Sequence, residues 1–134
     1  MSSLLTGLVT PALLLDAEKM QRNMQRLDDQ ARTLGVTLRP HVKTAKSVEV
    51  IRHLFKGGTG PITVSTLAEA EVFSGAGYTD ILYCVGVAPG KLERIISLRQ
   101  KGCDLAVILD SVAQAQAVAE AGIPALIEID SDGH

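Results

Sequence analysis

The sequence is poor in several residue types on which whole classes of protein depend. Its 134 residues include no tryptophan, two cysteines and only 3% aromatic residues. So few aromatic rings leave little on which nucleic-acid bases could stack. Cys84 and Cys103 form no CxxC pair, which argues against a disulfide framework. The formal net charge of −2 gives no electrostatic case for binding nucleic acid or an anionic membrane.

Long hydrophobic runs are missing as well. No apolar run approaches the length of a helix that spans a bilayer. The first eleven residues lack the basic start of a signal peptide, and Pro11 interrupts their apolar run. We therefore expect a cytoplasmic protein. With 46% hydrophobic and 21% charged residues, the chain has the length and composition of one globular domain.

Apolar strand candidates alternate with segments of helical periodicity. Strands are expected at residues 12–15, 37–43, 62–65, 81–85, 105–109 and 125–129. Apolar positions three and four apart predict helices over residues 20–34, 48–55, 67–76, 92–99 and 112–119. Residues 66–69 and 111–114 match the capping box. Further helix-boundary signals are N-caps at Asp16 and Asp110, Pro89 in a first turn, and left-handed glycines at Gly77, Gly102 and Gly122.

Strands that alternate with helices predict an α/β fold with a parallel sheet. Either an open doubly wound sheet or part of a closed (β/α)8 barrel fits this pattern. No GxGxxG motif follows the first strand, and the glycines at 57–60 follow a helix, as a helix stop and turn would. A barrel needs eight units and about 250 residues. We therefore expect a portion of a longer protein. The open sheet edges of such an incomplete barrel favour association into homo-oligomers.

A basic pattern stands out at the end of the strand expected over residues 37–43. In an extended segment Arg39, His41 and Lys43 point to the same face. Two cations and a histidine are costly to bury without partners. The pattern therefore indicates either a site near Lys43 for an anionic or chemically reactive group, or a strand end whose basic side chains lie in water.

Three motifs resemble a known family. They are TPALLLD at 10–16 with Asn23, RPHVKT at 39–44, and VSTLAEAE at 64–71 followed by Gly77 and DILY at 80–83. Together they resemble the D-threonine aldolase and eukaryotic-type D-serine dehydratase group of alanine racemase-like enzymes. The resemblance implies that residues 1–134 are the N-terminal part of a barrel domain that binds pyridoxal 5′-phosphate. It also implies that later strands and a C-terminal β domain lie outside this chain.

The resemblance implies that Lys43 is the Schiff-base lysine of the cofactor. An unprotonated amine can attack the cofactor's aldehyde and, once released, can act as a general base at the substrate. His41 and Arg39 are the further candidates for cofactor contacts; alternatively His41 fills polar space and Arg39 holds a carboxylate. Ser65 and Thr66 are weaker candidates at a strand end. No metal site is expected within this chain, because the resemblance places the metal ligands of such enzymes in the second domain.

The resemblance implies a lyase that cleaves or dehydrates β-hydroxy D-amino acids through Lys43, of which the 134 residues are a truncated chain that is expected to be inactive by itself. The alternatives are an amino-acid racemase with the same lysine, and a non-catalytic barrel that binds pyridoxal phosphate for cofactor homeostasis. In each enzymatic case the expected partner is a small amino acid. These activities differ in the bond that is broken, and the sequence does not contain the residues that choose it.

Overall fold

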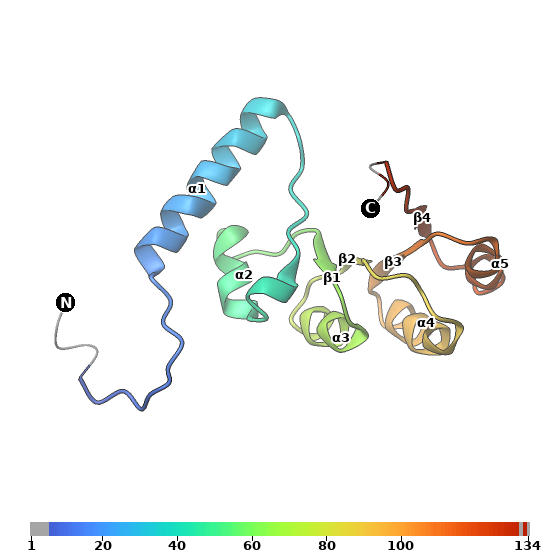
Figure 1. Cartoon of the computed structure of the whole chain (residues 1–134), viewed down its shortest axis with the longest axis horizontal. Helices are drawn as coiled ribbons and strands as arrows, with labels where there is room; N and C mark the ends of the chain where they lie inside the picture. Colours follow the sequence, from blue (N-terminus) through green and yellow to red (C-terminus); the bar gives the residue numbers. More distant parts are fainter. Residues whose placement is uncertain (1–5, 132, 134) are drawn as a thin grey trace. The chain divides into compact units, whose positions relative to one another are not determined.

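The computed structural model describes residues 6–131 and residue 133. The chain divides into two compact units, one up to Thr37 and one from Leu38 onward. The first unit contains helix α1 (Ala17–Leu34), labelled in Figure 1. Asp16 caps this helix by accepting a hydrogen bond from the Lys19 N–H, and Gly35 ends it at a φ of 65°. The expected cap at Asp16 is confirmed.

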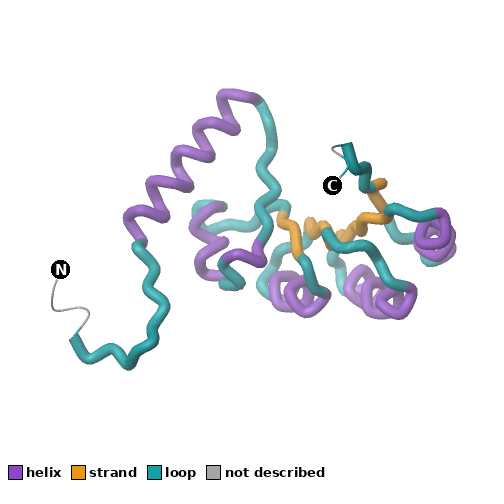
Figure 2. Tube along the Cα trace, viewed as in Figure 1, coloured by secondary structure: helices purple, strands orange, loops and turns teal. Residues whose placement is uncertain are grey.

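The second unit contains a four-stranded parallel sheet in the order β1-β2-β3-β4. Each strand pairs with the next strand along the chain, and α3, α4 and α5 lie together along one side of the strands (Figures 1 and 2). This arrangement is a partial barrel with the parallel α/β fold that the sequence predicts. Its elements are α2 (Val48–Leu54), β1 (Ile62–Val64), α3 (Leu67–Gly75), β2 (Asp80–Tyr83), α4 (Leu92–Gln100), β3 (Asp104–Leu109), α5 (Val112–Glu120) and β4 (Ala125–Ile127), with short 3-10 turns η2 (Val42–Thr44) and η3 (Pro89–Lys91).

Two expected strands are absent from the described residues. Residues 12–15 form no strand pairing with any described segment. In residues 37–43 the pairing is limited to an isolated bridge between His41 and Thr63 and a 2.8 Å hydrogen bond from the Thr63 N–H to the Pro40 carbonyl. Pro40 has no N–H to give to a ladder, and the chain turns into η2 directly after His41. Lys43 therefore lies in a 3-10 turn and not on a strand.

The hydrophobic core lies between the strands and helices α3 to α5. In β2 and β3 the side chains of Ile81, Tyr83 and Leu105 are buried toward the helices. The intervening residues Leu82 and Ala106, which are partners in the register, are half-buried on the other face. All three residues of β4 are exposed. Alternation along the strands thus separates a helix-facing layer from an inner face of the partial barrel.

The helix boundaries follow mostly from local side-chain chemistry. Thr66 and Glu69 form the predicted capping box at the start of α3. Ser111 caps α5, as the capping-box pattern at 111–114 predicts, and the alternative cap Asp110 is wrong: the Asp110 N–H instead donates to the Gln114 side chain at 3.0 Å. Gly77 has a φ of 96° after α3, a conformation that L side chains rarely adopt.

Tyr78 is a buried aromatic residue whose hydroxyl makes no hydrogen bond in the described part of the chain. Its ring packs edge-on against Phe73 and Phe55, with centroid distances of 5.4 and 6.0 Å. Burial raises the pKa of the Tyr78 hydroxyl. A buried hydroxyl without a partner costs stability, since it gives up its bonds to water.

Replacing Tyr78 with phenylalanine is therefore expected to leave the free energy of unfolding unchanged or to raise it by about 1 kcal/mol. Tyr83→Phe is the matched control, because the buried Tyr83 hydroxyl accepts a hydrogen bond from Lys91. That variant should lose about 1 kcal/mol. Urea unfolding of both variants measures the difference, and an equal loss in the two would show that the Tyr78 hydroxyl has a partner.

Candidate active site

Lys43 is held at the carboxyl end of the strand layer by a turn that His41 caps. The Nδ1 atom of His41 accepts a hydrogen bond from the Lys43 N–H at 3.2 Å. The Thr44 hydroxyl donates to the His41 carbonyl, also at 3.2 Å. The carbonyl of Val42 accepts from the N–H groups of Ala45 and Lys46 and closes the turn. The backbone at Lys43 is thus fixed while its side chain is exposed.

Ser65 brings the end of β1 next to this turn. Its hydroxyl lies 3.0 Å from the Nε2 atom of His41. The backbone N–H of Ser65 donates to the Glu69 carboxylate at 2.8 Å, and that of Thr66 donates to the same carboxylate at 3.2 Å. Glu69 therefore fixes the loop that carries Ser65, in addition to capping α3.

Both ring nitrogens of His41 have partners inside the protein. Because Nδ1 accepts the Lys43 N–H, the neutral ring carries its proton on Nε2 and donates it to the Ser65 hydroxyl. Burial lowers the pKa of His41, the positive charge of Lys43 lowers it further, and the Glu69 carboxylate opposes them. These effects favour the neutral ring, which is the form that this pair of hydrogen bonds requires.

The amine of Lys43 differs from those of nearby lysines. Lys46 lies 3.8 Å from the Glu69 carboxylate, and Lys91 donates to the Tyr83 hydroxyl. Within residues 6–131, the Lys43 amine makes no hydrogen bond or ion pair. Lys46 has a φ of 49° and precedes Ser47, which caps α2, so Lys46 lies outside that helix. Lys43 thus presents a free primary amine on a fixed turn.

Arg39 lies at the opposite end of the strands. Its guanidinium forms a 2.7 Å ion pair with Asp80 and donates to the carbonyl of Ile62 at 3.2 Å. Asp80 and Ile62 are the first residues of β2 and β1, whereas Lys43 and Ser65 lie beyond the carboxyl ends. The structure therefore brings His41 and Lys43 together and leaves Arg39 apart. A cofactor contact of Arg39 stays a prediction, and its observed contacts favour the alternative role of holding a carboxylate.

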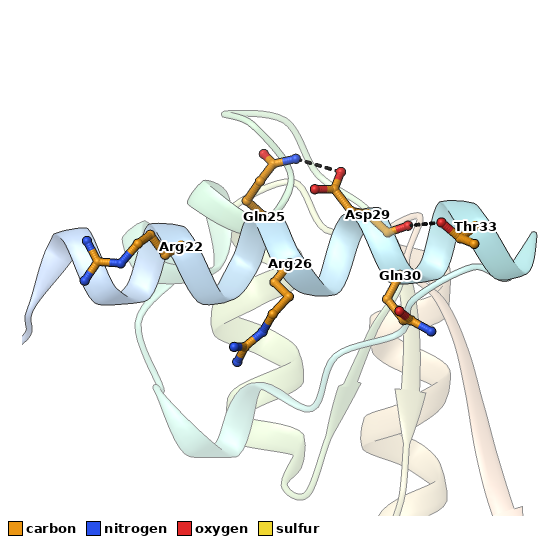
Figure 3. A pocket seen from close by; sticks show the side chains of 6 residues that line it. All are labelled: Arg22, Gln25, Arg26, Asp29, Gln30 and Thr33. Carbon is orange, nitrogen blue, oxygen red and sulfur yellow. Dashed lines mark hydrogen bonds between the residues drawn. The ribbon is translucent and has the colours of Figure 1, made fainter.

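Lys43 lines neither of two hollows in the described surface. One of about 420 Å³ is lined by Arg39, Asp80, Asp104 and neighbouring apolar residues at the amino ends of the strands. Another of about 430 Å³ runs along α1, where Gln25 donates to the Asp29 carboxylate at 2.9 Å (Figure 3). In barrels the chemistry is placed at the carboxyl ends, and the amino ends serve stability. We therefore place the candidate site at Lys43, on chemical grounds.

Several other polar residues have structural partners. Glu71 forms a two-pronged ion pair with Arg94 that joins α3 to α4. The hydrogen bond from Arg94 lowers the pKa of Glu71. Across the described residues no three His, Cys, Asp or Glu side chains gather as a metal site would require. Helices long and apolar enough to cross a membrane are likewise not found in the described part of the chain.

The fold and the site together define a class: a segment of a parallel β/α barrel with a free lysine at the carboxyl mouth of its strands. Residues 15–134 match the family model described as alanine racemase, N-terminal domain. Because the match covers most of the sequence, the chain belongs to this family.

Two relatives are dehydratases that act on hydroxylated D-amino acids. The D-threo-3-hydroxyaspartate dehydratase of Delftia sp. (strain HT23) is 50% identical over the whole of this chain, which covers 37% of that enzyme. Its solved structure matches with a TM-score of 0.91 and 51% identity over 96% of this chain and 35% of the other. The D-serine dehydratase of Dictyostelium discoideum is 30% identical over 89% of this chain and 31% of its own length.

A third relative is an aldolase. The structure of D-threonine aldolase from Filomicrobium marinum matches with a TM-score of 0.77 and 33% identity, over 91% of this chain and 35% of that one. The expected resemblance to both the aldolases and the dehydratases is confirmed. The chain spans about a third of the length of these relatives.

The sequence pattern indicated Lys43 and His41 as candidates but did not indicate that His41 is hydrogen-bonded to Ser65. The hydrogen bond between His41 and Ser65 joins residues 24 positions apart. A signal for it was present, because Ser65 follows an apolar strand and immediately precedes a capping box. That pattern places a hydroxyl at a strand end, where barrel chemistry is found.

Proposed function

We propose that this chain is the lysine-bearing part of a pyridoxal phosphate-dependent lyase that acts on β-hydroxy D-amino acids. The dehydratases of its family depend on this cofactor. The observation that carries the proposal is the free amine of Lys43 on a turn fixed by His41. We further propose that residues 1–134 form the N-terminal part of the cofactor-binding barrel domain.

The donor set at this end of the strands fits the cofactor. A primary amine is the group that bonds to an aldehyde, and Lys43 offers one that no carboxylate holds in the described residues. Lys46 is the neighbouring amine, and its contact with Glu69 draws it away from that role. Lys43 would therefore hold the cofactor, with His41 fixing the turn beneath it. His41 and Arg39 remain candidates for further cofactor contacts.

Pyridoxal phosphate supplies an electron sink for the negative charge that develops at the substrate α-carbon. Lys43 would hold the cofactor through its aldehyde, and its amine would become free to act on the substrate once the substrate is bound. Its freed amine can then accept the α-proton, or the proton of the β-hydroxyl. Which of the two protons it accepts distinguishes dehydration from aldol cleavage.

We propose dehydration of a 3-hydroxy D-amino acid as the reaction, supported by the 50% identity to the Delftia dehydratase. Aldol cleavage is the second candidate, supported by the structural match to the Filomicrobium aldolase. A variant of D-threo-3-hydroxyaspartate dehydratase has been solved in a metal-free form, so we propose a divalent metal as a second requirement of the whole protein. Homo-oligomerisation and a cytoplasmic location stay predictions.

The reaction is tested by incubating the purified whole protein, with pyridoxal phosphate and with or without a divalent metal, with 3-hydroxy-D-aspartate, D-serine or D-threonine. Dehydration is expected to release ammonia and a 2-oxo acid, whereas aldol cleavage releases glycine and an aldehyde. The L-enantiomers are the matched controls and should not react. Exchange of the α-hydrogen with solvent deuterium and loss of chirality, without either set of products, would indicate a racemase. Binding of the cofactor without any turnover would contradict the lyase.

A further inference from the structure

The Ser65 hydroxyl lies at the carboxyl end of β1, next to the turn that carries Lys43. The proposed function gives this hydroxyl no role. We propose that Ser65, aimed by His41, donates a hydrogen bond to an anionic oxygen of the molecule held at Lys43. This inference rests on the proposed function. It makes His41 a positioning residue, and Ser65 the group that touches the bound molecule.

The protons of the His41 ring determine where the Ser65 hydroxyl can point. The ring accepts the Lys43 N–H at Nδ1, which leaves the proton of the neutral ring on Nε2. That proton is donated to the Ser65 oxygen at 3.0 Å. The Ser65 hydroxyl is thereby an acceptor from His41, so its own proton must point elsewhere. In the described structure the Ser65 hydroxyl makes no second hydrogen bond, which leaves its proton available to a ligand.

The position of Ser65 is fixed independently of its hydroxyl. Its backbone N–H is held by the Glu69 carboxylate at 2.8 Å. The Val64 carbonyl, immediately before it, accepts from the Cys84 N–H at 2.8 Å, which extends the pairing of β1 with β2. A hydroxyl on a fixed backbone, with one direction taken by His41, has little freedom left to lose when it binds a ligand.

The same His41 ring links Ser65 to the turn that carries Lys43. Its Nε2 atom contacts the Ser65 hydroxyl, and its Nδ1 atom accepts the hydrogen bond from the Lys43 backbone N–H. A molecule bonded to the Lys43 amine therefore lies near the Ser65 donor. Two anionic oxygens are available there: the phenolate of the cofactor ring and the carboxylate of an amino-acid substrate. Hydrogen bonds to charged acceptors are stronger than those between neutral groups.

The inference is tested in the purified protein with Ser65→Ala, which removes the donor, and with Ser97→Ala on α4 as the matched serine control. If the acceptor is the cofactor phenolate, Ser65→Ala should weaken pyridoxal phosphate binding on the order of tenfold and shift its absorbance spectrum. If the acceptor is the substrate carboxylate, the cofactor spectrum should stay unchanged while KM rises on a similar scale. No change in any of these quantities would overturn the inference.

Two histidine variants separate the two hydrogen bonds of the ring. His41→Asn can retain an acceptor for the Lys43 N–H but has no donor that reaches Ser65. His41→Gln extends an amide N–H toward the place of Nε2. We expect His41→Asn to reproduce the Ser65→Ala effect, with no further change in the double variant, and His41→Gln to restore part of it. Additive effects of His41→Asn and Ser65→Ala would contradict the positioning role.

A measurement without cofactor keeps this inference distinguishable from the proposed function. The ¹⁵N resonances of the His41 ring in the cofactor-free protein should show the neutral form protonated on Nε2. A ring protonated on Nδ1 would overturn the proton count, whatever the cofactor does. If instead wild-type protein forms no bond between pyridoxal phosphate and Lys43, the proposed function fails, even with the expected His41 tautomer. Circular dichroism of each variant confirms that the fold is kept.

Discussion

Replacing Lys43 with alanine is expected to abolish covalent attachment of pyridoxal phosphate and to lower the proposed lyase activity of the whole protein by several orders of magnitude. The alanine side chain has no amine to bond to the aldehyde, and the base at the substrate is lost with it. Lys43 is exposed, so the truncation removes little packing and the fold should persist. Borohydride reduction followed by peptide mass mapping measures the attachment, and the release of 2-oxo acid measures the activity.

Two controls separate the chemistry of Lys43 from its charge. Lys43→Arg keeps the positive charge but offers no amine that bonds to an aldehyde, so it should be as inactive as the alanine variant. Lys101→Ala removes an exposed lysine from the turn after α4 and should behave like the wild type. If the Lys43→Ala protein still carried a cofactor that borohydride fixes in place, Lys43 would not be the attachment residue.

Replacing Phe73 with alanine is expected to reduce the free energy of unfolding by about 3–5 kcal/mol. The Phe73 side chain is 2% exposed in the layer between α3 and the strands. Its ring packs at an interplanar angle of 77° against Tyr78, so the variant loses both buried area and an edge-to-face contact. For a small domain this loss is a large part of the total stability. Urea unfolding followed by circular dichroism measures it.

The adjacent position provides a matched control for Phe73. Val72 lies on the same helix but is 62% exposed, so Val72→Ala should change stability by less than about 0.5 kcal/mol. Phe73→Leu keeps an apolar side chain in the layer and should cost less than Phe73→Ala. Equal losses for the alanine variants at 72 and 73 would contradict the burial of Phe73 that defines this layer.

The helices were predictable because their signals are local. The capping box from Thr66 to Glu69 and the apolar spacing of α1 act within a few residues, and both are found as expected. The cap of α5 shows the limit of this reasoning, since adjacent Asp110 and Ser111 are both good caps. Strands depend on a partner elsewhere. Residues 12–15 are apolar, but no described segment pairs with them.

The candidate site was predictable in its lysine and not in its arrangement. The RPHVKT motif indicated Lys43 through its resemblance to a family, and strand alternation indicated a shared face for Arg39 and His41. Alternation applies only while the chain stays extended, and η2 ends that extension at Val42. Whether Arg39 meets Asp80, 41 residues away, depends on the sheet register, which the sequence does not reveal.

The most direct test of the central claim is to add pyridoxal phosphate to the purified protein, reduce it with borohydride and map the modified peptides by mass. We predict one modified residue, Lys43, because its free amine stands on the turn that His41 fixes at the carboxyl ends of the strands. The amines of Lys46 and Lys91 are engaged by Glu69 and Tyr83, and the exposed Lys101 lies on the turn after α4, away from that end. Labelling spread over the exposed lysines, or none at all, would contradict the claim that this turn holds the cofactor.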